Sequence, residues 1–420
     1  MNPVQDVPRA PAWLFDPQLN DAKRHFHGCH RALAPSETVA RVRPLMSRMG
    51  MTRIANVTGL DRIGLPVVMV CRPNARSLAV SQGKGSDLAA ATASGLMEAA
   101  ELYHAEHIEL PLKLGSLAEL AHSHAFVDTD RLPRISDRFR SDLVTLWVEG
   151  CDLISGASCW VPYESVRANF TLPPPPGSGC FDCSSNGLAS GNTMIEAACH
   201  AICEVVERDA TTLWKAATPQ DRAATGLDLD SVGDPACREV LDRLERADFD
   251  VTAWETTSDT AIPAFFCLIS DRRDPLQHHG IGAGAHPVRA IALLRALTEA
   301  VQVRTTYISG ARDDLSPEEY AAPRRAERAR IAARWRGEHR PVRDFAAIAE
   351  FSSSSFSADL DWLLGRLRAA GVEQVVAVDL RKPGLGLCVI CLVIPGLEGP
   401  DDHPAYMPGE RARKLRAGRP

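Results

Sequence analysis

Three glutamates recur at helical spacing in residues 193–216, a segment predicted to form a long helix. At roughly 100° per residue, Glu196 and Glu207 lie about 20° apart around the axis, and Glu204 lies about 80° from Glu196. Alanine, isoleucine and valine cover most of the remaining surface, which is typical of a largely buried helix. Buried carboxylates must be protonated, paired or neutralised by a cation. An all-oxygen ligand set suits Mg²⁺, which usually completes its coordination with phosphate oxygens. This row of three glutamates, the carboxylate stripe, therefore favours a nucleotide site over ion pairing with Arg208.

A second set of polar side chains lies on an earlier predicted helix, residues 88–107. Ser94, Glu98 and Glu101 are four and three positions apart, so they share one face. Lys84 precedes this helix in Ser-Gln-Gly-Lys-Gly, which is predicted to form a turn between a strand and the helix. Glycines let backbone N–H groups approach an anion, and a helix N-terminus adds partial positive charge. The motif lacks the P-loop spacing, so an ordinary strand-to-helix turn is an equal alternative.

A third predicted helix, residues 287–307, carries Glu299, Gln302 and Arg304 and is followed by Arg312. An arginine fork can bind two phosphate oxygens at once, which a lysine cannot do. For Arg304 alone, surface charge at a helix end is the favoured interpretation.

The three helices are predicted to lie in a mixed α/β or α+β architecture, because strand and helix patterns alternate without a repeat. Thr193 and Glu196 have the spacing of a capping box, and Pro287 is predicted to open the third helix. The remaining predicted elements are a helix at 36–49, shortened or kinked at Pro44, and strands at 52–57, 66–71, 77–80, 251–256, 264–270, 372–378 and 387–394.

Composition narrows the class of protein. The chain has 420 residues, of which 45% are apolar and 24% charged, and a net charge of −6. These values exclude a mainly disordered chain, a collagen-like repeat and a coiled coil, and they indicate neither nucleic acid nor an anionic membrane as a partner. The N-terminus lacks a signal-peptide pattern, and the longest apolar run is too short to span a bilayer. We therefore expect a cytoplasmic protein.

Twelve cysteines at irregular spacing predict thiols rather than a disulfide scaffold. Cys180 with Cys183 and Cys388 with Cys391 form two CxxC pairs, which makes a structural zinc site a minority hypothesis. Cys183 is also a minority candidate for handling sulfur. His200 lies on the carboxylate stripe, where a hydrogen-bonded structural histidine is the favoured interpretation.

Taken together and in this order, four motifs resemble those of the YcaO family. They are SxGKG, SxxxExxE, NGLASGNTxxEAxxxxxxExxERDA and QxR followed by RDD. The resemblance covers roughly residues 28–400. It implies one large α+β domain with carboxylate-bearing helices packed on mixed or antiparallel sheets, and a noncanonical ATP site. The expected organisation is an N-terminal extension over 1–28, a YcaO domain over 29–400 and a basic C-terminal tail over 401–420.

The resemblance also implies roles for individual residues. The implied Mg²⁺ ligands are Glu98, Glu101, Glu196, Glu204 and Glu207. The implied ATP contacts are Arg31, Thr38, Lys84, Ser94, Arg208, Gln302, Arg304 and Arg312. The resemblance does not assign a catalytic base.

Members of that family activate a peptide backbone amide: a nucleophile adds to the carbonyl, the oxygen takes the γ-phosphoryl group of ATP, and phosphate leaves. A Cys, Ser or Thr side chain of the substrate as nucleophile gives an azoline, whereas external sulfide gives a thioamide. Azoline-forming members typically end in a proline-rich tail, whereas residues 411–420 here are basic.

Segments such as TRIANVTGLDRIGLPV and GLMEAAELYHAE look most like members that work beside TfuA proteins. The expected function is therefore thioamide formation in a ribosomally made precursor peptide, with a TfuA-like partner. An azoline-forming cyclodehydratase is the alternative. An inactive nucleotide-binding scaffold is a further alternative, against which the five glutamates argue. A homodimer is consistent with the family resemblance.

Overall fold

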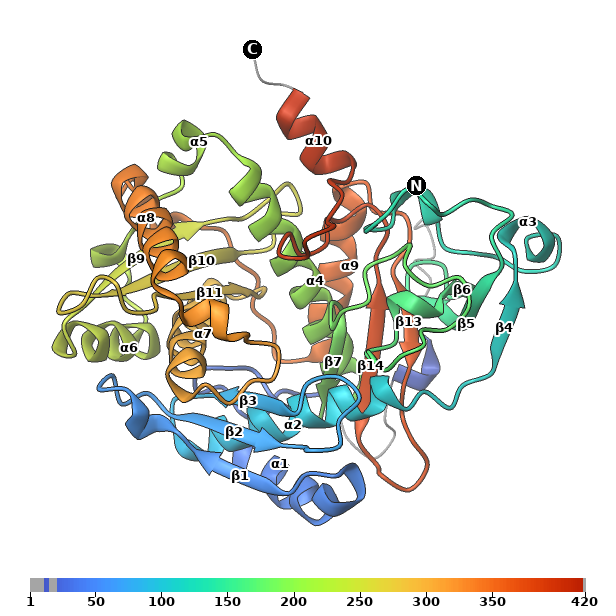
Figure 1. Cartoon of the computed structure of the whole chain (residues 1–420), viewed down its shortest axis with the longest axis horizontal. Coiled ribbons are helices and arrows are strands. Elements are labelled where there is room, and N and C mark those ends of the chain that lie inside the picture. The colour runs from blue at the N-terminus through green and yellow to red at the C-terminus, as the bar shows by residue number, and fades with distance from the viewer. Residues whose placement is uncertain (1–10, 15–20, 418–420) are drawn as a thin grey trace, which may run out of the picture.

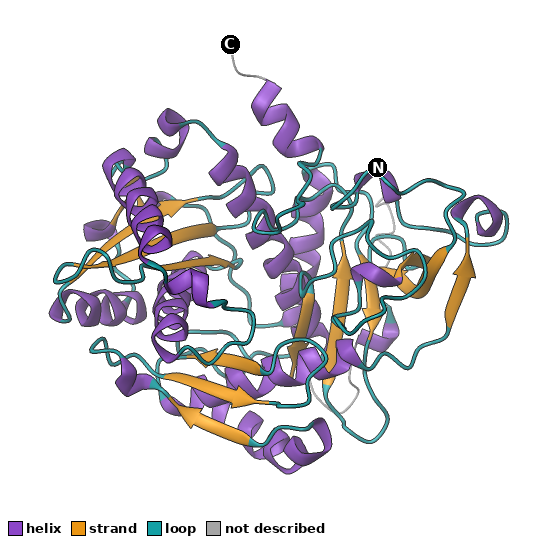
Figure 2. Ribbon diagram, viewed as in Figure 1, coloured by secondary structure: helices purple, strands orange, loops and turns teal. Residues whose placement is uncertain are grey.

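The computed structural model describes residues 11–14 and 21–417 of the chain. This part of the chain has an α+β fold in which helices and mainly antiparallel sheets alternate (Figure 2). Its α-helices are α1 (Pro35–Val42), α2 (Leu88–Glu106), α3 (Leu117–Leu120), α4 (Met194–Ala216), α5 (Pro219–Ala223), α6 (Pro235–Arg246), α7 (Arg289–Ser309), α8 (Ala322–Glu338), α9 (Phe356–Ala369) and α10 (Glu410–Ala417).

The strands form three antiparallel sheets and one short parallel pair. One sheet has the order β1-β2-β3, with β1 (Arg53–Asn56), β2 (Val67–Cys71) and β3 (Val80–Lys84). A second has the order β11-β10-β9, with β9 (Phe249–Glu255), β10 (Ala264–Asp271) and β11 (Gly280–Ala285). The largest runs β4-β5-β13-β14-β7, with β6 also paired to β5; its strands are β4 (Leu112–Gly115), β5 (Thr145–Asp152), β6 (Ser158–Pro162), β7 (Leu188–Gly191), β13 (Val376–Asp379) and β14 (Cys388–Val393). The parallel pair is β8 (Leu227–Asp228) with β12 (Arg343–Asp344).

Helix α4 occupies the centre of the molecule (Figure 1). It packs on β7 and β14 of the largest sheet and also on β10 and β11 of the second sheet. Most of its apolar positions are buried, and Ile202 and Val206 have no exposed surface, as the predicted broad apolar surface requires. Helix α2 packs on β3 and β7, and α7 packs on β11 and β3. The three helices that carry the charged motifs therefore meet between the sheets.

The helix boundaries follow the sequence closely, with two corrections. The Thr193 hydroxyl accepts a hydrogen bond from the Glu196 N–H, so the α4 N-cap is confirmed. The reciprocal half of the predicted capping box is not formed, because the Glu196 side chain turns toward Ala32. Helix α7 begins two residues after Pro287, with Val288 as its N-cap. The helix predicted at 36–49 does shorten near Pro44: α1 ends at Val42 and a 3₁₀ segment continues to Met49.

The Ser-Gln-Gly-Lys-Gly segment does not form the predicted turn. The strand predicted at 77–80 is instead β3, and it contains Gly83 and Lys84. A Cβ atom on Gly83 would lie 1.9 Å from the Ala91 carbonyl oxygen in α2, a distance that no side chain tolerates. Gly83 is therefore required because β3 and α2 pack backbone against backbone.

Several strands of the largest sheet were not predicted. One is β7, whose sequence Leu-Ala-Ser-Gly has neither β-branched residues nor a period of two, although all four residues are buried. It is a strand because β14 pairs with it, in the register Ile390 to Ala189. By contrast, the predicted strands at 251–256 and 264–270 are confirmed as β9 and β10.

The described residues near the N-terminus contact the rest of the fold. Leu14 is fully buried in the core beside α4 and α9. The Lys23 ammonium is buried and pairs with Asp359 on α9 at 2.6 Å. None of the helices in the described part of the chain is both long enough and apolar enough to cross a membrane.

Candidate functional site

Two glutamates near the middle of α4 are held in surroundings that disfavour their charge. The Glu207 side chain is 3% exposed, and its Oε2 has no hydrogen-bond partner among the described residues. Burial raises the pKa of Glu207, and the neighbouring charge of Glu299 on α7 raises it further. Burial likewise raises the pKa of Glu204 to about 8. Carboxylates in this state gain most from a cation that enters beside them.

Two more glutamates face the same region from α2. Glu98 accepts a hydrogen bond from the backbone N–H of Gln82 on β3 at 3.1 Å. Glu101 accepts hydrogen bonds from the N–H and the hydroxyl of Ser190 on β7, at 2.7 and 2.6 Å. Burial raises the pKa of Glu98, and it raises the pKa of Glu101 to about 7. The backbone of the glycine-lysine motif therefore does bind an anion, but the anion is the chain's own carboxylate.

Glu196 lies at the other end of the α4 stripe and has different partners. Its side chain is 2% exposed, and it accepts hydrogen bonds from the Ala32 N–H at 3.0 Å and from Arg31 at 3.3 Å. Burial opposes the charge of Arg31, but Glu196 holds the pKa of that guanidinium above its ordinary value. Beside this pair, the Thr38 hydroxyl donates to Asn192 at 3.0 Å. The segment before α1 is thus tied to the start of α4.

Cations surround the acids of α4. Burial opposes the charge of Arg208, yet Glu207 and Glu204 raise its pKa above the ordinary value. The Lys84 ammonium lies 3.5 Å from Glu299, which was part of a sequence motif but not among the predicted ligands. Four chain segments, β3, α2, α4 and α7, therefore contribute to one charged cluster. Its members are Lys84, Glu98, Glu101, Glu204, Glu207, Arg208 and Glu299.

Gln302 and Arg312 lie at the edge of that cluster. The Gln302 amide donates to the Gln82 side chain at 3.3 Å, and its own oxygen has no partner among the described residues. Arg312 donates to Asp314 at 2.8 Å, and burial of its guanidinium is outweighed by Asp314 and Glu98, which raise its pKa. Arg312 therefore lies within electrostatic reach of Glu98.

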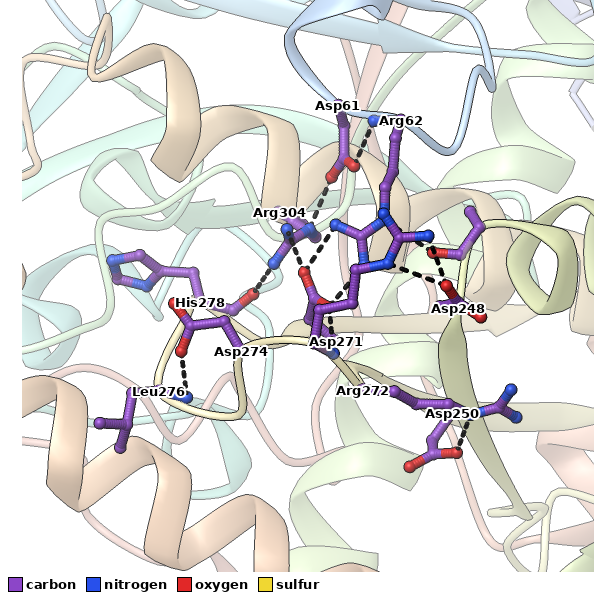
Figure 3. A network of polar contacts seen from close by, with 12 residues as sticks. Asp61, Arg62, Asp248, Asp250, Asp271, Arg272, Asp274, Leu276, His278 and Arg304 are labelled. Atoms are coloured by element: carbon purple, nitrogen blue, oxygen red, sulfur yellow. Dashed lines mark hydrogen bonds and ion pairs between the residues drawn. The ribbon is translucent and has the colours of Figure 1, made fainter.

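Arg304 is not at the surface and does not join the cluster, which corrects the prediction. Its side chain is 3% exposed and pairs with Asp61 and Asp271, the latter at 3.2 Å (Figure 3). It also donates to the carbonyl oxygen of His278 at 2.7 Å. Since its nitrogens already have partners, the structure does not support a nucleotide contact by Arg304.

Cavities give a second view of the predicted residues. A cavity of about 90 Å³ is lined by Arg31, Thr38, Ser94, Glu101 and Glu196, together with neighbouring backbone. A larger cavity, about 610 Å³, lies elsewhere, between the C-terminal end of α4 and α10. Cavity size alone would therefore point away from the charged cluster, and the chemistry of the side chains is the better guide.

The donor set fits Mg²⁺. No three His, Cys, Asp or Glu side chains within residues 11–14 and 21–417 close into a complete metal site by themselves. Mg²⁺ usually takes one or two carboxylates from the protein and the rest of its oxygens from phosphates and water. The unpartnered oxygen of Glu207 and the raised pKa values of Glu98, Glu101 and Glu204 match that mode of binding.

The cysteines do not form a zinc site in the described chain. None of the twelve forms a disulfide. Cys180 and Cys183 donate to the carbonyl oxygens of Gly177 and Arg167, and the zinc hypothesis is therefore wrong for the part of the chain that the structure describes. Burial raises the pKa of Cys183 to about 11, so it is a protonated thiol at neutral pH and a poor nucleophile.

Two residues near Glu207 were missed or misjudged from the sequence. Arg295 on α7 lies 3.8 Å from Glu207 and donates to His200 at 3.4 Å. His200 is not the fully hydrogen-bonded histidine that was expected, because its Nδ1 has no partner among the described residues. Arg295 is four positions before Glu299, so helical spacing could have identified it.

The raised pKa values predict an unusual pH dependence of stability. Glu101 and Glu204 have folded-state pKa values of about 7 and about 8, above the value of about 4.3 expected when unfolded. Between these limits the folded protein binds more protons than the unfolded chain, so its stability falls as pH rises. We expect the Mg²⁺-free protein to lose on the order of 6 kcal/mol of this contribution between about pH 5 and pH 8.5.

Thermal unfolding in a chelator across that pH range measures the effect. Glu204→Gln should flatten the profile, and adding Mg²⁺ to the wild type at pH 8.5 should restore stability by binding the ionised acids. Parallel profiles for the wild type and Glu204→Gln would contradict the assignment.

The comparisons with known proteins agree with this geometry. The family model described as YcaO cyclodehydratase, ATP- and Mg²⁺-binding, matches residues 82–398. An uncharacterised protein in the tfuA 3′ region of Rhizobium leguminosarum bv. trifolii is 36% identical over 88% of each chain. An uncharacterised protein of Methanothermobacter thermautotrophicus is 34% identical over 88% of this chain and 95% of its own.

Solved structures show the same fold. YcaO from Methanopyrus kandleri, solved with AMPPCP and Mg²⁺, superposes with a TM-score of 0.72 at 23% identity, covering 90% of this chain and 94% of its own. A heterocyclase solved with substrate and cofactor superposes with a TM-score of 0.73 at 22% identity over 90% of this chain, which spans about half (54%) of that longer protein. The expected α+β fold is confirmed. On the family match and on the identity to its relatives, the chain belongs to the YcaO family, whose domain binds ATP and Mg²⁺.

Proposed function

We propose that this protein uses ATP and Mg²⁺ to activate a backbone amide of a ribosomally made peptide, and that the product is a thioamide. One observation carries the proposal most directly: burial raises the pKa values of four glutamates from α2 and α4, and one of them, Glu207, is buried with an unpartnered oxygen. A scaffold without chemistry has no use for so many carboxylates that are costly to bury.

In this proposal Glu98, Glu101, Glu204 and Glu207 hold Mg²⁺, with Glu196 at the edge of the set. Their positions are set in advance, because Gln82 and Ser190 orient the two α2 carboxylates through hydrogen bonds. Such orientation keeps the ligands from having to rearrange when the metal enters.

The nucleotide contacts are proposed at both sides of the acids. Arg208 and Arg312 carry positive charge beside Glu207 and Glu98 and would bind phosphate oxygens. Lys84 and Gln302 would lie near the same phosphates. Arg31, Thr38 and Ser94 line the 90 Å³ cavity and would contact the rest of the nucleotide. When bound, ATP supplies the phosphoryl group that converts an amide oxygen into a phosphate leaving group.

The relatives bear on the nature of the product. The Rhizobium relative is encoded in a tfuA 3′ region, which supports a TfuA-like partner and thioamide formation here. The solved heterocyclase supports the alternative, an azoline-forming cyclodehydratase acting on Cys, Ser or Thr. The two relatives therefore support different products, and these products differ in mass.

Co-expression with a candidate precursor peptide, with and without a TfuA-like protein, tests the proposal by intact mass. Exchange of one oxygen for sulfur that needs the TfuA-like protein is the expected result. Loss of water without that protein would favour the cyclodehydratase. Glu204→Gln is the matched inactive control, since it keeps the helix and its volume. An unchanged peptide mass together with no peptide-dependent ATP consumption would leave only the scaffold alternative.

A further inference from the structure

Arg295 contacts the cluster in a way that differs from the other buried ion pairs. Its Nη2 lies 3.8 Å from Glu207 Oε2, beyond hydrogen-bond distance, and its Nε has no partner in the described chain. A bidentate arginine–carboxylate ion pair has two hydrogen bonds near 2.8 Å. Arg62 shows that form with Asp271, at 2.8 and 2.5 Å. The Arg295–Glu207 contact is therefore loose, and each partner keeps an unused bonding position.

The second contact of Arg295 fixes the proton on His200. Burial lowers the pKa of His200 well below its ordinary value, and the nearby charge of Arg295 lowers it further, so the ring is neutral. Arg295 can only donate, so the ring nitrogen that it contacts, Nε2, must be the acceptor. The proton is then on Nδ1, which has no partner among the described residues. Arg295 thus holds His200 in one tautomer, and its positive charge opposes part of the effect of burial on the Glu207 carboxyl group.

We propose that Arg295 is a built-in substitute for the metal cation at Glu207. In the metal-free protein its guanidinium offsets the carboxylate charge without satisfying it, and Mg²⁺ displaces it on binding. The loose geometry is what makes the exchange feasible, because little hydrogen bonding is lost when the arginine leaves. The inference rests on the Mg²⁺ site of the proposed function, and it is independent of which peptide product is formed.

Calorimetric titration of Mg²⁺ into the nucleotide-free protein at pH 8 tests the competition. Arg295→Met removes the charge and keeps much of the side-chain volume, so it should bind Mg²⁺ about tenfold more tightly than wild type. Arg295→Lys should behave like wild type. Arg289→Met is the matched control, because Arg289 is on the same helix but lies 3.5 Å from Glu350. Unchanged or weaker Mg²⁺ binding by folded Arg295→Met would overturn the proposal.

A second measurement separates displacement from simple repulsion and needs no variant. In ¹⁵N spectra of the wild type, the His200 ring signals should shift when Mg²⁺ saturates the site, since Nε2 loses its donor. Signals that stay at their metal-free positions at saturation would show that Arg295 does not move. Failure of the peptide chemistry would leave both results intact, whereas a wild type that binds no Mg²⁺ would overturn the site and this inference together.

Discussion

Glu207→Gln is expected to weaken Mg²⁺-dependent ATP binding by at least about 100-fold and to reduce peptide-dependent ATP consumption to background. Loss of a group that only orients a metal ligand typically costs 10- to 100-fold, and a direct ligand should cost more. Glu207 also has a buried oxygen without a hydrogen-bond partner among the described residues, so that oxygen is available to a metal ion. Calorimetry with ATP, with and without Mg²⁺, measures the loss.

The same substitution should leave the fold intact. An amide is less costly to bury than a carboxylate, so Mg²⁺-free Glu207→Gln should unfold at the same temperature as the wild type or higher. Glu239→Gln, at a half-exposed pair with Arg243 on α6, is the control and should bind ATP normally. Wild-type ATP affinity in folded Glu207→Gln would refute the placement of the metal on α4.

Arg304→Met is expected to destabilise the protein by about 3–5 kcal/mol, because it leaves the buried Asp61 without its arginine partner and Asp271 with Arg62 alone. Arg304 joins the loop of Asp61 to Asp271 at the end of β10 (Figure 3). Burial alone would raise the pKa of Asp271, but hydrogen bonds from Arg62 and the charges of Arg62 and Arg304 lower it to about 2. This network therefore favours folding above about pH 4 and loses that contribution as pH falls toward 2.

Urea unfolding at pH 7 measures the cost of Arg304→Met. Adding Asp61→Asn to the variant should recover part of the stability, since it removes the uncompensated charge. Folded Arg304→Met should bind ATP within about threefold of wild type. A variant with normal stability and no ATP binding would instead restore the nucleotide contact first expected for Arg304.

The helices and their acidic faces were predictable because they depend on neighbours in the sequence. A helical period brings Glu98 to Glu101 and Glu204 to Glu207, and an apolar surround indicates that α4 is buried, whatever the rest of the chain does. The ends of α4 and the strands β9 and β10 followed from similarly local patterns.

Partners of charged groups were not predictable, since they come from distant segments. Arg304 is 243 residues from Asp61, and Glu196 is 164 residues from the Ala32 N–H that takes the place of its capping bond. A buried charge is stable with whichever partner the packing supplies, and its own residue type does not identify that partner. The surface interpretation of Arg304 and the full capping box at Thr193 failed for this reason.

The sequence by itself therefore determined which residues can bind metal and phosphate, namely the glutamates of two helices and the arginines near them. It also determined the order of motifs that identifies the family. Only the tertiary structure decided how they are used. It made Gly83 a packing contact rather than an anion cradle, and it placed Arg295 of α7 against Glu207 and His200 of α4. The physical reason is that helical periodicity acts over a few residues, whereas burial and ion pairing depend on which helices and sheets pack together.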